Sequence, residues 1–216
     1  MRKVSNESLT FNAPMRSSPS YLPADERRLA TVETVIALAG STNPGDITTS
    51  AIASEMGLTQ GALFRHFPTK ESIIEAVIDW VVEHLMARVE TAAGSVSAPL
   101  ASLEAVFLAH IDFVARHPGV PRIVFGQLQH AGQTVAKSTV QAMLQRYGQR
   151  IVALLAQAHT RGEVDAALDI EAATTLFIGT IQGLVMQSLI HGDVARMLAD
   201  APRVFHIYRR GIAQGP

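Results

Sequence analysis

Two short runs of small and hydroxyl-bearing residues stand where two short helices are expected to begin. The first run, residues 48–50, is Thr-Thr-Ser, and the second, residues 59–62, is Thr-Gln-Gly-Ala. Hydroxyl oxygens cap helix N-termini, and the free N–H groups at such ends bind phosphate. In a DNA major groove Gln reads adenine, Ala contacts the thymine methyl, and Gly lets the backbone approach closely. These residue types therefore offer the chemistry of DNA recognition, with simple helix capping as the alternative for the hydroxyls.

A series of predicted helices positions both runs. Apolar residues recur at helical spacing from Leu29 to Ala39, and turn-forming residues follow them. Pro68 ends the second short helix, and Thr69 caps a long one. The expected helices cover about residues 23–39, 48–57, 60–67 and 70 onward. A helix, a short turn and a second helix form the arrangement that inserts a helix N-terminus into the major groove.

The apolar positions on these helices face inward by their spacing, and we expect them to be buried. They are Leu29, Val32, Val35, Ile36, Ala39, Ile52, Met56, Leu63, Phe67, Ile73, Ile74, Val77, Ile78, Val81 and Leu85. Beyond Gly94, the pattern predicts further helices over about 99–116, 118–128, 133–161, 169–191 and 201–212. Because no alternating run typical of a strand is present, the predicted fold is all-α.

The segment from Ile47 to Ile73, ITTSAIASEMGLTQGALFRHFPTKESI, resembles the DNA-binding domain of the tetracycline-repressor (TetR) family of transcriptional regulators. The resemblance covers about residues 24–73, and its most specific residues are Gly61, Leu63, Phe64, His66, Phe67 and Lys70. It implies an N-terminal three-helix helix-turn-helix DNA-binding domain followed by a larger helical effector-binding and dimerisation domain. We accordingly expect an N-terminal arm over 1–22, a DNA-binding domain over 23–70 and a ligand-binding and dimerisation domain over 71–216.

The residues expected at DNA follow from the two helix starts and from the resemblance. They are Thr48, Thr49, Ser50, Thr59, Gln60, Gly61, Ala62, Phe64, Arg65, His66 and Lys70. The family usually has Tyr at position 64, with a hydroxyl that reaches a phosphate, so Phe64 weakens this anchor. Arg65 and Lys70 are either phosphate contacts or solvated surface residues. His66 is either a phosphate donor or a structural hydrogen-bonding residue.

A single recognition helix contacts few base pairs, so specific binding normally requires a dimer that sets the spacing of two half-sites. The resemblance implies that the last two long helices form this dimer. The small and apolar residues expected at the interface are Leu176, Gly179, Gly183, Met186, Ile190, Phe205 and Tyr208. The alternative is that these faces belong to the core of a single chain.

The resemblance also implies a small-molecule effector in the second domain, whose binding moves the long helix that begins near Lys70. The candidate ligand-binding residues are Trp80, Phe107, His110, Ile111, Phe125, Met143, Tyr147, Phe177, Gln182 and Met186, and each could instead be ordinary core. Charged residues are scarce among the candidates. The effector is therefore expected to be largely apolar or aromatic.

Composition narrows the remaining function classes. The 216 residues include no Cys, which excludes disulfides and Cys-ligated zinc and fits a reducing cytoplasm. Metal-binding and nucleophile motifs are missing, so we expect neither an enzyme nor a cofactor or metal. The predicted partners are double-stranded operator DNA with an inverted repeat, a small effector and a second copy of the chain, with no membrane. A helical interaction scaffold that has lost specific DNA binding is the alternative.

Overall fold

The computed structural model describes residues 23–213, and every regular element in that range is a helix. The elements are α1 (Ala24–Ser41), η2 (Pro44–Asp46), α2 (Thr49–Glu55), α3 (Gln60–Phe64), α4 (Lys70–Gly94), α5 (Pro99–Arg116), α6 (Gly119–Gln129), α7 (Val135–Thr160), α8 (Ile170–His191) and α9 (Val194–Ile212). The all-α prediction is confirmed. The expected N-terminal arm, 1–22, lies outside the described residues.

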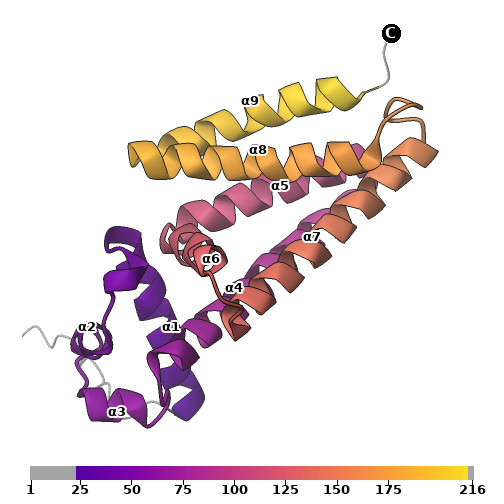
Figure 1. Ribbon diagram of the computed structural model, residues 1–216. Helices are drawn as coiled ribbons and strands as arrows, with labels where there is room; N and C mark the ends of the chain where they lie inside the picture. The colour runs from indigo at the N-terminus through magenta and orange to yellow at the C-terminus, as the bar shows by residue number, and fades with distance from the viewer. Residues whose placement is uncertain (1–22, 214–216) are drawn as a thin grey trace, which may run out of the picture.

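Helices α1, α2 and α3 form a small head at one end of the molecule (Figure 1). The predicted caps are present: the Thr48 hydroxyl accepts from Ala51 N at 3.1 Å, and the Thr59 hydroxyl accepts from Ala62 N at 3.2 Å. Such caps satisfy N–H groups that a helix start leaves without a partner. The apolar residues of the head converge on a shared core that includes Val35, Ile36, Ile52, Leu63 and Phe67. The head is therefore a helix-turn-helix with the chemistry of both helix starts kept at its surface.

Two helix bounds and three burial assignments differ from the sequence-based expectation. Helix α3 ends at Phe64 rather than near Phe67, because the chain turns there, with the amide of His66 donating to the carbonyl of Leu63. Helix α9 begins at Val194 rather than near 201. The Asp193 carboxylate caps it by accepting from Arg196 N at 2.8 Å, and Pro202 is accommodated inside the helix.

The burial differences have a simple geometric cause. The buried face of α1 starts at Thr31, so Leu29 lies before it and is 44% exposed. Met56 and Ile74 are only partly buried, because they lie at the margin of the core rather than inside it. All the other positions expected inside are buried.

The larger body is built on α4, which leaves the head and runs beside α7 (Figure 1). Helix α4 also packs on α5, while α8 and α9 pair with each other and close the opposite side. Between α5, α8 and α9, the rings of Phe107, Phe177, Phe205 and Tyr208 form an aromatic cluster with centroid separations of 5.3–6.5 Å. The body therefore places its α8–α9 pair far from the tip of the head.

Head and body meet where α6 crosses α1 at Gly119, the first residue of α6. A Cβ atom on Gly119 would lie 2.0 Å from the carbonyl oxygen of Ile36 and 2.9 Å from the amide nitrogen of Gly40. Both atoms are backbone, so neither can turn aside as a flexible side chain would. The two helices therefore touch backbone to backbone, and only glycine permits this contact.

Candidate DNA-binding surface, effector cavity and dimer face

The N-terminal turn of α3 lies exposed at the tip of the head. Thr59, Gln60 and Gly61 are all exposed, and a Cβ on Gly61 would meet nothing within 4 Å. The Gln60 side-chain amide donates to the Thr49 hydroxyl at 2.8 Å. This bond joins the starts of α2 and α3 into one polar surface that is accessible to a binding partner.

The other predicted DNA contacts of this region differ in exposure. Thr48, Ser50 and Arg65 are exposed, Ala62 is partly buried, and Phe64 is 40% exposed despite its apolar ring. An exposed aromatic ring without a hydroxyl can pack on a sugar but offers no hydrogen bond to a phosphate. Most of the candidate residues of α2 and α3 are therefore exposed, and the hydrogen bond between Gln60 and Thr49 links the starts of the two helices.

His66 is engaged within the protein. Its ring lies 3.4 Å, Nε2 to Nη1, from Arg27, and its carbonyl accepts a hydrogen bond from Arg28. The Arg28 guanidinium also lies over the Phe67 ring, 4.3 Å from its centroid. These contacts tie the end of α3 to α1, and so the half-buried His66 helps to hold α3 in place.

Lys70 lines a cleft between head and body. Its ammonium group donates to the carbonyl of Gly45 in η2 at 3.2 Å. The cleft has a volume of about 510 Å³ and is lined by residues of both charges, including Glu71, Glu75 and Arg122. The ammonium group has three N–H donors, so Lys70 can donate to a phosphate while it keeps its bond to the Gly45 carbonyl.

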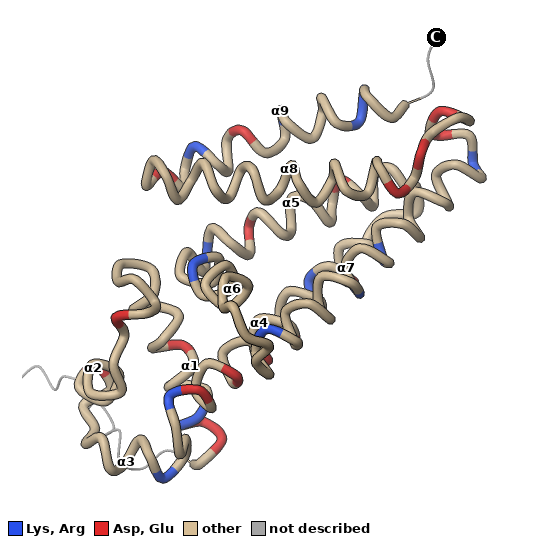
Figure 2. Tube along the Cα trace, in the orientation of Figure 1, with Lys and Arg blue, Asp and Glu red and all other residues tan. Residues whose placement is uncertain are grey.

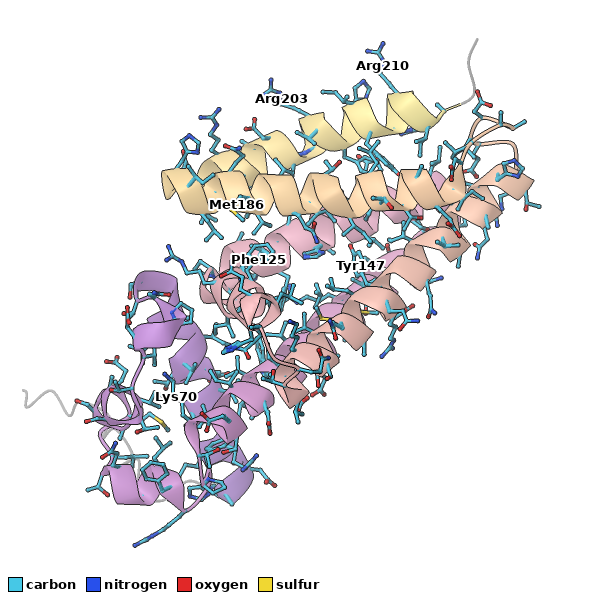
Figure 3. The ribbon with its side chains drawn as sticks, in the orientation of Figure 1. Lys70, Phe125, Tyr147, Met186, Arg203 and Arg210 are labelled. Carbon is cyan, nitrogen blue, oxygen red and sulfur yellow. The ribbon has the colours of Figure 1, made fainter. Side chains whose placement is uncertain are left out.

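A smaller, apolar cavity of about 80 Å³ lies inside the body. Residues of α4, α5, α6, α7 and α8 line it: Val81, Leu85, His110, Phe113, Val114, Val120, Pro121, Val124, Phe125, Met143, Leu144, Tyr147, Ile178, Ile181, Gln182 and Val185. Five of the predicted ligand-binding residues are among them, namely His110, Phe125, Met143, Tyr147 and Gln182. In Figure 3, Phe125 and Tyr147 lie in the region enclosed by α6, α7 and α8, whereas Arg203 and Arg210 point outward from α9.

The other five predicted ligand-binding residues do not line this cavity. Phe107 and Phe177 belong to the aromatic cluster, and Ile111 is fully buried elsewhere in the core. Trp80 stacks on the ring of His84 at 4.0 Å, and Met186 is 43% exposed on the outer side of α8. Sequence reasoning missed aliphatic wall residues such as Val81 and Val124, because an apolar side chain on an inward helix face has the same pattern whether it borders a cavity or packed core.

The cavity holds no charged side chain, and its two interior polar groups are paired. His110 Nδ1 and the Tyr147 hydroxyl lie 3.2 Å apart, with the rings edge to face. Burial lowers the pKa of His110 to about 4 and raises the pKa of Tyr147, because a buried site disfavours the charged form of each. Both groups are therefore neutral at physiological pH. Gln182, the third polar lining residue, is exposed.

Helix α8 presents an uncovered apolar face. Leu176 is 57% exposed and Ile190 65%, and a Cβ at either Gly179 or Gly183 would meet nothing within 4 Å. Figure 2 shows this helix almost free of charge along its length. By length and composition alone α8 is apolar enough to cross a membrane, as the core helices of many soluble proteins also are. Of its most apolar stretch, 28% is buried within the chain. An apolar face of this kind calls for a covering partner.

Two residues expected at the dimer interface lie elsewhere. Phe205 and Tyr208 are buried within the chain as part of the aromatic cluster. The Tyr208 hydroxyl donates to the carbonyl of Ala173 at 3.1 Å, which fastens α9 to α8. Both side chains face α5 and α8, where Phe205 contacts the ring of Phe107 and Tyr208 contacts the ring of Phe177. The five expected residues of α8 remain on the exposed face.

Two family models match the chain. One, described as "Bacterial regulatory proteins, tetR family", covers residues 36–77, which include α2, α3 and the start of α4. The other, described as "Tetracyclin repressor-like, C-terminal domain", covers residues 126–201. The two matches fall on the head and on the body respectively.

Curated relatives and solved structures are also similar to the chain. The chain is 26% identical over 147 residues to the nucleoid occlusion factor SlmA of Shewanella amazonensis, covering 68% of this chain and 75% of that protein. The ketosteroid transcriptional regulator KstR2 of Mycobacterium tuberculosis superposes with a TM-score of 0.75 at 21% identity, covering 88% of this chain and 96% of that one. The transcriptional regulator FadR of Bacillus subtilis in complex with stearoyl-CoA superposes with a TM-score of 0.72 at 18% identity, covering 85% and 98%.

Proposed function

Because the chain belongs to the TetR family of bacterial regulatory proteins, we propose that it is a dimeric repressor released from a palindromic operator by a small, largely apolar effector. DNA-binding regulation of transcription is the function of the family. The observation that carries the proposal is the exposed start of α3, where Gln60 and Gly61 face outward beside Thr49. The site of action would be the cytoplasm, where bacterial DNA lies.

The start of α3 enters the major groove in this proposal. Gln60 exchanges its bond to the Thr49 hydroxyl for two hydrogen bonds to an adenine, and Gly61 lets the helix approach the base edges. Thr48, Ser50 and Arg65 reach the flanking phosphates, which fix the register but read no sequence. The division into a DNA-binding domain over 23–70 and a ligand-binding and dimerisation domain over 71–216 is part of the same proposal.

A selection of bound fragments from random double-stranded DNA tests this function. A dimeric regulator enriches an inverted repeat whose half-sites are separated by one helical turn or a multiple of it. A helical scaffold without specific DNA binding enriches no sequence, and this result would reject the proposal. Apolar compounds are then screened for release of the enriched fragment.

Replacing Gln60 by alanine is expected to weaken binding to the selected operator by roughly 1–3 kcal/mol, because a bidentate base contact is lost. Binding to random DNA should change little, since no base is read there. Titration of both DNAs by fluorescence anisotropy measures the difference. An equal loss on both DNAs would remove Gln60 from the base-reading residues.

Replacing Lys70 by alanine tests the phosphate contact at the start of α4. If Lys70 donates to a phosphate as well as to the Gly45 carbonyl, the alanine variant binds every DNA sequence more weakly. The slope of log affinity against log salt concentration should fall in magnitude by about 1, as expected for one lost phosphate contact. An unchanged slope would leave Lys70 as a residue that only braces η2 against α4.

The proposed dimer joins two copies through the α8 face. The exposed residues Leu176, Met186 and Ile190 supply apolar area, and the two glycines allow a partner helix to approach closely. Two heads are then held at a set spacing. Because this face is apolar, uncharged and exposed in the single chain, we expect a second copy of the chain to cover it in solution.

The cavity can influence the head because of the helices that line it. Val81 and Leu85 come from α4, which begins at the head, and Val120 and Pro121 come from α6, which touches α1 through Gly119. Pockets that hold drug-sized ligands have volumes of roughly 300 Å³ or more, well above the cavity volume of about 80 Å³. An effector larger than a single small ring would therefore push these helices apart, which shifts the head and separates the dimer's two recognition helices from their half-sites. The stearoyl-CoA bound to the similar FadR has a long apolar chain, which supports an apolar effector here.

A further inference from the structure

The effector cavity contains one interior pair of polar side chains, His110 from α5 and Tyr147 from α7. His110 Nδ1 and the Tyr147 hydroxyl are hydrogen-bonded at 3.2 Å, and within residues 23–213 each side chain makes this hydrogen bond and no other. Apolar residues such as Phe113, Val124 and Met143 make up most of the remaining wall. The pair is therefore the place in the interior where a ligand can satisfy a polar group.

Counting protons shows what this pair can offer. A neutral imidazole and a neutral phenol carry one N–H and one O–H between them, and their mutual bond uses one of these two protons. If Tyr147 donates, the imidazole keeps a free N–H, and if His110 donates, the phenol keeps a free O–H. In either tautomer, one donor remains for a ligand, with no positive charge to accompany it.

From this geometry we infer that the part of the effector inside the cavity is electrically neutral and carries a hydrogen-bond acceptor, such as a ketone, ester or hydroxyl oxygen, held by His110 and Tyr147. The inference rests on the proposed function, because it concerns the effector cavity. A carboxylate or phosphate there would be buried without a counter-charge, since the lining includes no Lys or Arg. Any charged portion of an effector therefore remains outside the cavity.

Three one-ring probes of similar shape test the inference on the full chain. A cavity of about 80 Å³ is on the scale of a single small ring, so the probes are acetophenone, ethylbenzene and benzoate. Calorimetric titration should give acetophenone about tenfold tighter binding than ethylbenzene, because one buried hydrogen bond is added. Benzoate should bind roughly 100-fold more weakly than acetophenone, because its charge is buried without a partner.

Variants identify the residues responsible. Each single replacement leaves one donor, so the double variant His110→Leu with Tyr147→Phe is the decisive one, and acetophenone should lose its advantage over ethylbenzene in it. Met143→Leu alters the same wall without touching a polar group and should keep the preference. Gln182 is exposed and so can hydrogen-bond to solvent, and Gln182→Leu should therefore change the preference little.

The outcomes separate this inference from the proposed function. If acetophenone and ethylbenzene bind equally, or if benzoate binds as tightly as either, the inference of a neutral effector with a hydrogen-bond acceptor is overturned. The cavity would then still bind an effector, but one of a different chemical class. If no probe binds, both the class and the effector cavity are rejected, while operator binding, measured separately, stands. If the double variant does not fold, the ranking of the three probes on the unmodified chain still decides.

Discussion

Replacing Gly119 by alanine is expected to lower the free energy of unfolding by about 3 kcal/mol, the upper end of the usual cost of overpacking. The added Cβ would stand 2.0 Å from the Ile36 carbonyl oxygen, well inside van der Waals contact. Because the obstructing atoms are backbone, α6 must move away from α1 as a whole. Denaturant unfolding followed by circular dichroism measures the change.

A second alanine in the same helix provides the matched control. Gly126 is also in α6, but a Cβ there would meet nothing within 4 Å. Gly126→Ala should raise the stability by roughly 0.5–1 kcal/mol, because alanine favours the helix over glycine. If the two variants are equally stable, the α1–α6 contact does not constrain the molecule in the way that the structure indicates.

The same Gly119 variant has a consequence for regulation. Helix α6 lines the effector cavity on one side and touches the head on the other, so a displaced α6 should also change operator binding. We expect a folded fraction of Gly119→Ala to bind the operator more weakly than the Gly126→Ala protein does. Comparing operator affinity per folded molecule separates this effect from the loss of stability.

Replacing Leu176 by glutamate is expected to abolish the dimer and to weaken operator binding by about 100-fold, because one head alone contacts a single half-site. Leu176 is 57% exposed in the single chain, so the glutamate is tolerated there. In the dimer, the same carboxylate would be buried against an apolar partner without a counter-charge. Size-exclusion chromatography with light scattering measures the mass, and anisotropy titration measures the affinity.

Val135→Glu serves as the control for this variant. Val135 is 65% exposed at the first position of α7, away from the α8 face, and an acidic residue suits the start of a helix. This protein should remain dimeric and bind the operator as before. A Leu176→Glu protein that stays dimeric would show that α8 does not form the interface.

Much of the fold was predictable because its signals are local. Hydroxyl caps at Thr48, Thr59 and Thr69, the stop at Pro68 and the spacing of apolar residues each act within a few positions of the chain. The start of α9 was misplaced because two residues, Asp193 and Pro202, can each mark the start of a helix. The cap at Asp193 prevails, and the helix continues through Pro202.

A candidate site was easier to predict from the sequence when its residues lie close together in the chain. Gln60 and Gly61 lie at a helix start that the sequence marks, and the structure leaves both exposed, as expected. The outward placement of the α8 residues also follows the predicted face. By contrast, half of the predicted ligand-binding residues line no part of the cavity, since Phe107 and Phe177 fill an aromatic cluster instead.

The amino-acid sequence by itself determined an all-helical chain, the position of its helix-turn-helix and the family to which that motif belongs, because capping, helix periodicity and turn chemistry act between near neighbours. The tertiary structure alone decided which buried residues border a cavity, that His110 meets Tyr147 there, and that Gly119 touches the backbone of α1. These features depend on how helices distant in sequence cross one another. Crossing geometry is set by the packing of the whole core, and no short stretch of residues encodes it.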